Sequence, residues 1–327
     1  MLDTLDLTGP WACLIEPLQG ALEAAKRIGP VGYSAARRSY PVMSDGTAVL
    51  SVSGVLTKRD SWFSPASYSQ LRSELGQMKT DNRVARVLVH VDSGGGQTMG
   101  LFDLVSDLQA AGKPTWAYIE DVGASAAFAI ACACDRIYAN RSAVIGSIGT
   151  FAVLQDSSKA AKNLGIKVHV IRAGAHKGVG VPGAEITSEH LEDMQRIVNQ
   201  LNEQFLDVVM RGRRMSSGRV ETIATGQVWI GEEAARLGLI DGVRSLDSVF
   251  REFSAVGSPA GQTGIRAEAT PYDPGPLTET DQAELFEAAM RLNETKGMSR
   301  FAAAAKAQRK YPEWHEAYTR RHNPATV

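Results

Sequence analysis

Residues 115–139 read TWAYIEDVGASAAFAIACACDRIYA. It begins with a run of β-branched and aromatic residues (115–119) that is typical of a buried strand. A glycine-containing turn, a helix of small residues (123–134) and a second short strand (136–139) follow. Parallel sheets covered by helices are built from such strand–helix–strand units. The stretch therefore predicts an α/β domain.

The segments on either side continue this alternation. The predicted strands are 47–56, 86–91, 115–119, 136–139 and 166–171, and the predicted helices are 67–78, Leu101–Leu108, 123–134 and 157–164. Strands that alternate with helices favour a mainly parallel sheet with helices packed on it.

One long helix is predicted from Thr187 to about Met215. Its apolar residues alternate three and four positions apart, at Leu191, Met194, Val198, Leu201, Phe205 and Val208. Such a narrow stripe packs against the rest of the domain or, alternatively, against another subunit. Smaller units are predicted after it, at 217–225, 228–230, 231–237, 239–243 and 245–253.

Composition excludes several classes of protein. The 327 residues carry 35 Lys and Arg against 36 Asp and Glu, and this net charge of −1 argues against a dedicated nucleic-acid binder. The acidic start, MLDTLDLTGP, is unlike a secretory signal, and no apolar run is long enough to span a bilayer. We therefore expect a cytoplasmic protein with no membrane contact. Cys13, Cys132 and Cys134 fit no disulfide or metal spacing, so we interpret Cys132 and Cys134 as core residues.

The chain divides into four predicted parts. They are an N-terminal lead-in (1–45), a folded domain (46–253), a Gly/Pro-rich linker (254–280) and a charged helical tail (281–327). Acidic residues gather at the start of the tail and basic residues at its end, a separation that is typical of interaction segments.

Three segments are candidates for chemistry. Ser125 follows a strand and begins a helix, where backbone N–H groups favour developing negative charge, although a serine there is more often a packing residue. Ser93-Gly94-Gly95-Gly96 follows another strand, either as an ordinary turn or as a loop of backbone donors. Lys177 lies in a run of small residues after the predicted strand 166–171. It is either a solvated charge or, if desolvated, a general base.

Other catalytic arrangements find less support. No histidine stands in recognisable triad context, and His176 beside Lys177 is the only tempting one. Metal-ligand spacings and a phosphate-binding GK[ST] sequence are missing, so we expect no metal and no organic cofactor.

Taken together, the three segments resemble the signal peptide peptidase A family of serine peptidases. GASAAFAIACACDRIYANRSAVIGSIGT (123–150) resembles its nucleophile segment, SGGGQTMG (93–100) its SPGGG loop, and IRAGAHKGVG (171–180) its lysine loop. Ser125 lies 29 residues after Gly96 and Lys177 lies 52 residues after Ser125, as in the short members of the family. The resemblance covers roughly residues 45–250 and includes GQVWIGEEAARLGLIDGV (226–243).

The resemblance implies a fold, an activity and roles for individual residues. The fold is the α/β spiral shared by Clp-type peptidases and crotonases. The activity is peptide-bond hydrolysis by a dyad of Ser125, the nucleophile, and Lys177, the general base. Backbone N–H groups of Gly96, Ala126 and Gly95 would bind the oxyanion, and Ser147, in the family's GSIG, would orient Lys177 or serve only as a turn residue. Gly94 replaces the family's proline, and Ala126-Ala127 replaces Gly-Gly.

The layout of a peptidase joined by a linker to a charged tail resembles the capsid-assembly proteases of tailed phages. It implies a homo-oligomer that cleaves protein substrates and binds capsid, portal or scaffold proteins through its tail. Three alternatives stay open: a structural capsid protein with a vestigial site, a cellular protein-quality peptidase, and a crotonase-type acyl-CoA enzyme. The last would need a catalytic carboxylate and would place Lys177 far from Ser125.

Overall fold

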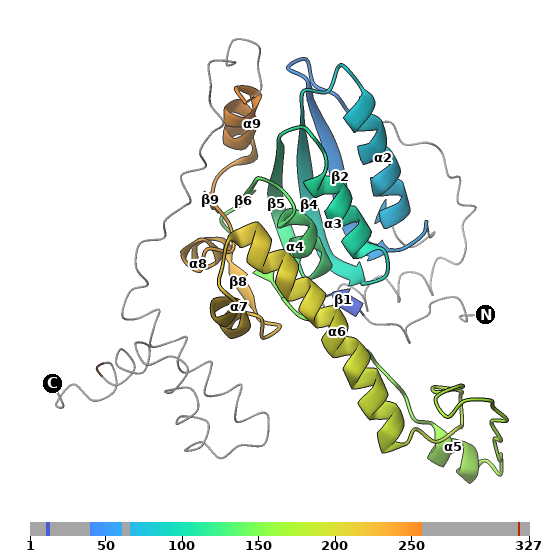
Figure 1. Cartoon of the computed structure of the whole chain (residues 1–327). Coiled ribbons are helices and arrows are strands. Elements are labelled where there is room, and N and C mark those ends of the chain that lie inside the picture. Colours follow the sequence, from blue (N-terminus) through green and yellow to red (C-terminus); the bar gives the residue numbers. More distant parts are fainter. Residues whose placement is uncertain (1–10, 14–39, 61–65, 257–319, 321–327) are drawn as a thin grey trace.

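The computed structural model of the chain describes residues 11–13, 40–60, 66–256 and 320 (Figure 1). Its strands are β1 (Trp11–Cys13), β2 (Thr47–Thr57), β3 (Ala66–Ser67), β4 (Arg86–Gln97), β5 (Thr115–Ala124), β6 (Arg136–Ala139), β7 (Val144–Gly146), β8 (Val228–Ile230) and β9 (Gly242–Val243). Its helices are α2 (Tyr68–Thr80), α3 (Leu101–Gln109), α4 (Ala126–Ala131), α5 (Ser158–Asn163), α6 (Ser188–Arg213), α7 (Ser217–Ile223), α8 (Gly231–Arg236) and α9 (Leu246–Ser254).

The described strands form one mainly parallel sheet in the order β3-β2-β4-β5-β6-β9. Two pairs are antiparallel, β1 with β4 and β7 with β8. The strand β5 pairs with β6 along its first half and with β7 along its second half, so its neighbour on this side changes along its length. This change brings the end of β5 and the end of β7 together.

Alternate residues of the central strands pack on opposite faces of the sheet. Val87, Val89 and Val91 of β4 belong to the core cluster that also contains the apolar residues of α2, α3 and α4. Leu88, by contrast, belongs to a second cluster, with Trp116, Tyr118, Tyr138, Val249 and Phe253. Because helices cover both faces, the strands are apolar at nearly every position, which is why the sequence shows continuous apolar runs.

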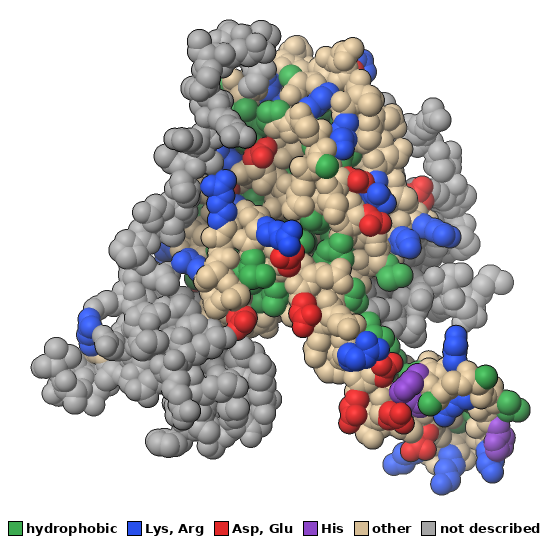
Figure 2. All heavy atoms as spheres, viewed as in Figure 1, with side chains coloured by type: hydrophobic (Ala, Val, Ile, Leu, Met, Phe, Trp, Pro, Cys, Tyr) green, Lys and Arg blue, Asp and Glu red, His purple; other side chains and the backbone are tan. Residues whose placement is uncertain are grey.

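The sheet and the helices packed on it form the body of the structure. An arm extends from this body at the end of α6 that lies away from α4 (Figure 1). It consists of residues 151–187, which include α5, and of the first turns of α6. Acidic, basic and histidine side chains gather on it (Figure 2). The arm also exposes large apolar side chains: Val153, Leu164, Ile166, Ile171 and Leu191.

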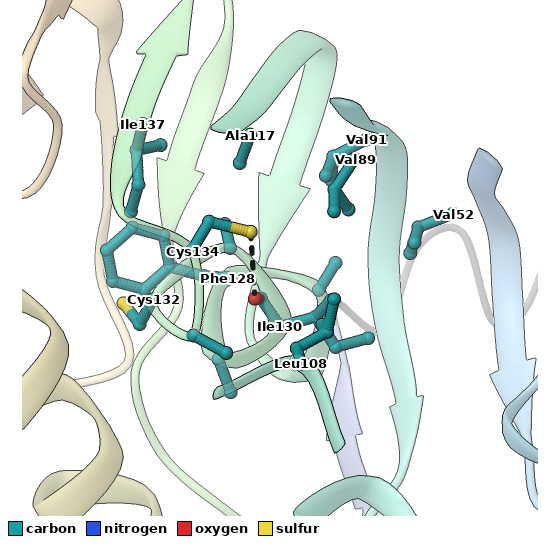
Figure 3. Close-up of a cluster of buried hydrophobic side chains, with 14 of the residues drawn as sticks. Val52, Val89, Val91, Leu108, Ala117, Phe128, Ile130, Cys132, Cys134 and Ile137 are labelled. Atoms are coloured by element: carbon teal, nitrogen blue, oxygen red, sulfur yellow. Dashed lines mark hydrogen bonds between the residues drawn. The ribbon is translucent and has the colours of Figure 1, made fainter. Parts of the chain in front are cut away.

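The helix α4 lies in the centre of the core (Figure 3). All six of its residues are buried, because small side chains let the helix approach the sheet closely. Cys132 and Cys134 follow it as buried free thiols, and the Sγ of Cys134 contacts the carbonyl of Ile130 at 3.9 Å. Burial raises the pKa of Cys132 to about 12 and raises that of Cys134 as well. The interpretation of these two cysteines as core residues is confirmed.

Three sequence-based predictions differ from the structure in their local details. Residues 166–171 form no strand, and Ile171 is 98% exposed. Ser93–Gly96 are not a turn, because β4 continues through them to Gln97. The helix predicted at 123–134 is shorter, since β5 runs to Ala124 and α4 begins at Ala126.

The remaining predictions have different outcomes. The long helix exists, but its apolar stripe is buried only near its end, at Phe205 and Val208. The linker from residue 257 onward and the tail lie almost wholly outside the described residues. Of the helices in the described part of the chain, none is long and apolar enough to cross a membrane.

Candidate active site

Ser125 occupies a strained turn between β5 and α4. Its backbone has φ 55° and ψ −120°, which a residue with a side chain adopts at a cost of roughly 1–3 kcal/mol. Two backbone hydrogen bonds fix this turn: the N–H of Ser125 donates to the carbonyl of Gly146 (2.7 Å), and the N–H of Ala129 donates to the carbonyl of Ser125 (3.0 Å). A serine on a sharp strand-to-helix turn is the geometry of a nucleophile elbow.

The hydroxyl of Ser125 is buried and unpaired. The residue is 1% exposed, and its Oγ has no hydrogen-bond partner. Leaving a buried hydroxyl unpaired costs about 1–3 kcal/mol. Among the described side chains only the Oδ1 of Asn202, on α6, is in the same state. A strained, orphaned hydroxyl indicates a group that is kept for a ligand.

Ser147 lies beside Ser125 through the pairing of β5 with β7. Ala124 is opposite Gly146 in the register, and one of the two serines follows each of these residues. Ser147 is buried, has φ 48°, and donates its N–H to the carbonyl of Gln227 (2.6 Å). The sequence motif GSIG therefore places a second hydroxyl-bearing residue next to the candidate nucleophile.

Gly146 has no room for a side chain. It has φ 118°, and a Cβ there would lie 2.7 Å from the ring of Trp229 on β8. The downstream segment that contains Trp229 thus holds the turn at Ser147 from the other side.

Gly95 and Gly96 of β4 make different contacts with their neighbours. The N–H of Gly95 donates to the Oγ of Ser93 (3.1 Å), so it is already engaged. Gly96 lies so close to β2 that a Cβ would be 1.9 Å from the carbonyl oxygen of Leu56. Glycine is required at this position by that close approach.

Ala126 is the first residue of α4, and the serine before it makes no side-chain cap. The first N–H groups of a helix have no partner within the helix. The first backbone N–H groups of α4, directly after Ser125, therefore have no partner within the helix.

Lys177 is not brought to Ser125 within one chain. It is exposed in the arm, between α5 and α6, while the Oγ of Ser125 has no partner. Arg172 ties this loop to the start of α6, because its Nη1 lies 3.3 Å from the carbonyl oxygen of Lys177 and 3.3 Å from the Nε2 of His190. The Nε2 of His176 lies 3.7 Å from Glu189, also on the arm. Neither Lys177 nor His176 completes a site with Ser125 in the single chain.

Carboxylates and metal ligands do not gather at Ser125. Among the described residues, the only buried carboxylate side chain is that of Glu74 on α2, where it accepts a hydrogen bond from Gln70. No group of three or more His, Cys, Asp or Glu within the described ranges is placed to hold a metal ion. The site's own chemistry is that of a hydroxyl and backbone donors.

The strained serine and the segments around it lie within a family match. Residues 107–256 match the model of Peptidase family S49. This S49 region contains Ser125, Ala126, Ser147 and Lys177, so the resemblance stated from the sequence is confirmed.

Curated relatives include peptidases. The chain is 31% identical over 180 residues to a putative protease of Methanocaldococcus jannaschii, covering 54% of this chain and 58% of the relative. It is 31% identical over 219 residues to the capsid assembly protease C of Escherichia phage lambda, covering 65% of this chain and 49% of the relative. The match thus spans about half the length of these relatives.

Solved structures with a similar arrangement have low identity. One is an enoyl-CoA hydratase/isomerase family member, with 18% identity, a TM-score of 0.40, and coverage of 84% of this chain and 89% of that chain. Another is a ClpP1 variant from Listeria monocytogenes, with 9% identity, a TM-score of 0.41, and coverage of 61% and 94%.

Proposed function

We propose that the protein is a serine endopeptidase whose nucleophile is Ser125. The observation that carries this proposal is the combination of strain and burial at Ser125, whose Oγ is unpaired. The S49 region around it supports peptide-bond hydrolysis as the reaction. The Oγ attacks the substrate carbonyl and forms an acyl-enzyme, which water then hydrolyses.

Two backbone N–H groups bind the oxyanion in this proposal. Ala126 supplies the first, because it follows the nucleophile and has no cap. Gly96 supplies the second, since the N–H of Gly95 is already donated to Ser93. Each such donor is commonly worth about 3–4 kcal/mol in the transition state.

Lys177, in its neutral form, accepts the proton from the Ser125 hydroxyl and later passes it to the leaving amine. Because Lys177 lies on the arm, we propose that assembly of several copies completes the site, with the lysine loop of one copy reaching the serine of another. The exposed apolar residues of the arm support this step. Leu164 is 75% exposed and Ile171 is 98% exposed, and exposed apolar patches mark protein contacts. Ser147 then orients the lysine amine.

The natural substrates in this proposal are capsid or scaffold proteins. The lambda relative, whose printed name is that of a capsid assembly protease, supports this substrate class. The linker (254–280) and tail (281–327) then hold the peptidase domain (46–253) to its capsid, portal or scaffold partner. This division of the chain rests on the charge pattern of the sequence.

An acyl-CoA enzyme of the crotonase type is the second candidate, because Lys177 lies apart from Ser125 in one chain. That chemistry needs a catalytic carboxylate. Among the described residues the only buried carboxylate is that of Glu74, which accepts a hydrogen bond from Gln70 on α2. A strained and orphaned serine would also have no role in it.

Replacement of Ser125 tests the proposal. The variant Ser125→Ala should lose nearly all cleavage of co-expressed capsid and scaffold proteins while staying folded, because removal of one hydroxyl leaves little cavity. Ser142→Ala, at an exposed loop serine, is the matched control and should cleave as the natural chain does. Comparable products from Ser125→Ala on a gel would remove Ser125 from the mechanism.

A further inference from the structure

The strand β1 lies against the glycine-rich end of β4. Trp11, Ala12 and Cys13 are opposite Gln97, Gly96 and Gly95 in an antiparallel register. On its other side, the same end of β4 is parallel to β2, through Val55 and Leu56. The described strand β1 is therefore an addition to an edge that the parallel sheet leaves open.

This edge is open because β5 turns away at the candidate nucleophile. The last pair between β4 and β5 is Ser93 with Gly123. Two residues further along, β4 has reached Gly95, whereas the segment that follows β5 has reached Ser125 and turns into α4. Cys13 is opposite Gly95, so β1 takes up the place beside β4 that β5 vacates, directly after the nucleophile turn.

The open edge is held as a rigid template for an extended chain. The hydroxyl of Tyr68 donates to the carbonyl of Gln97 (2.6 Å), and the backbone N–H of Lys58 donates to its Oε1 (2.9 Å). Gly95 and Gly96 present backbone with no side chain in the way. Such an edge recognises a peptide through its main chain, by strand addition.

We propose that Trp11–Cys13 occupies the site where an extended polypeptide substrate adds to β4, and so acts as an intramolecular competitor of substrate. This inference rests on the proposed peptidase function, since it places the substrate strand beside Ser125. A tethered segment has an effective local concentration in the mM range, so a substrate in trans must displace it before it is bound. The edge of β4 then binds either the chain's own segment or an extended protein substrate, and one can replace the other.

A reversible disulfide tests this exchange in the full chain. Trp11 and Gln97 are directly opposite, and opposed residues of an antiparallel pair have Cα atoms about 4.5–5.5 Å apart, which suits a disulfide. The variant carries Trp11→Cys and Gln97→Cys together with Cys13→Ser and Ser125→Ala. The probe is a fluorescein-labelled peptide of residues 8–17 with serine in place of Cys13, and its affinity is measured by fluorescence anisotropy before and after reduction.

The disulfide should form, and the reduced protein should bind the probe at least ~10-fold more tightly than the oxidised protein, because only the reduced strand can leave. Failure of the disulfide to form would mean that Trp11 does not lie opposite Gln97, and equal affinity in the two states would make β1 a fixed strand. Either result would overturn the inference. A second variant keeps Ser125 and carries the other three substitutions. Its oxidised and reduced forms are both assayed for hydrolysis of casein. Redox-dependent binding without any hydrolysis would refute the peptidase function while leaving the competition at β4 in place.

Discussion

At the scale of single residues, strain and burial gather at the β5–β7 junction. Ser125 and Ser147 have positive φ without being glycine, and Gly146 lies between them in space with φ 118°. These conformations persist because neighbouring backbone groups over-determine them. The sequence singled out Ser125 and Ser147 as candidates, but it did not predict their strain, because left-handed backbone at a serine has no sequence signature.

Gly146→Ala tests how far the turn depends on this packing. The added Cβ would meet the ring of Trp229 at 2.7 Å on a strained backbone, so we expect a loss of about 1–3 kcal/mol in the free energy of unfolding and a large loss of activity. Gly112→Ala is the control, because its φ is +71° but nothing lies within 4 Å. Urea unfolding of the two variants compares them, and equal losses would mean that Trp229 does not hold the turn.

The buried thiols give a prediction on pH. Burial raises the pKa of Cys132 to about 12 and raises that of Cys134, whereas a thiol in the unfolded chain has a pKa near ~8.5. Neutral thiols stabilise the fold below the unfolded pKa, and this contribution is lost as the pH rises through ~8.5 towards the folded values. In a Cys13→Ser variant, iodoacetamide at pH 8 should alkylate neither cysteine until urea unfolds the protein. Rapid alkylation of the folded protein would contradict their burial.

At the scale of elements, the sequence predicted the central strands and helices because apolar periodicity reports burial. The run at 166–171 was predicted as a strand on the same grounds, yet in one chain it is irregular and exposed. In the proposed assembly, this apolar run contacts another copy of the chain. The extension of β4 through Ser93–Gly96 was missed because glycines usually end strands.

The helix α9 packs on the core close to the last residue of the described range 66–256. Phe253 is fully buried and stacks on Trp116 with ring centroids 4.6 Å apart, and the Nε of the buried Arg86 donates to the carbonyl of Val256 (2.6 Å). Truncation after Val256 should leave the free energy of unfolding almost unchanged. Phe253→Ala should lower it by about 3–5 kcal/mol. Urea denaturation measures the two, and a truncated chain that unfolds as easily as Phe253→Ala would show that later residues support the core.

At the scale of the whole molecule, the body and the arm carry different halves of the proposed dyad. Ser125 is buried in the body, and Lys177 is exposed in the segment 151–187 of the arm. Figure 1 shows that the arm lies at the far end of α6. The family resemblance of the sequence implied the two residues but not which copy each serves, since the sequence of one chain carries no information about symmetry. Closed assembly of identical copies would repeat the same serine-to-lysine contact around the oligomer.

Complementation between two inactive variants tests the proposed dyad most directly. Ser125→Ala lacks the nucleophile, and Lys177→Met keeps much of the stem of the side chain but no base. Each alone should be inactive on casein. Unfolding and refolding them together in equal amounts should restore about a quarter of the natural activity, because random assembly joins an intact serine to an intact lysine at one site in four. Full activity of Lys177→Met alone, or no recovery in co-assembled oligomers, would contradict a Ser125–Lys177 dyad shared between copies.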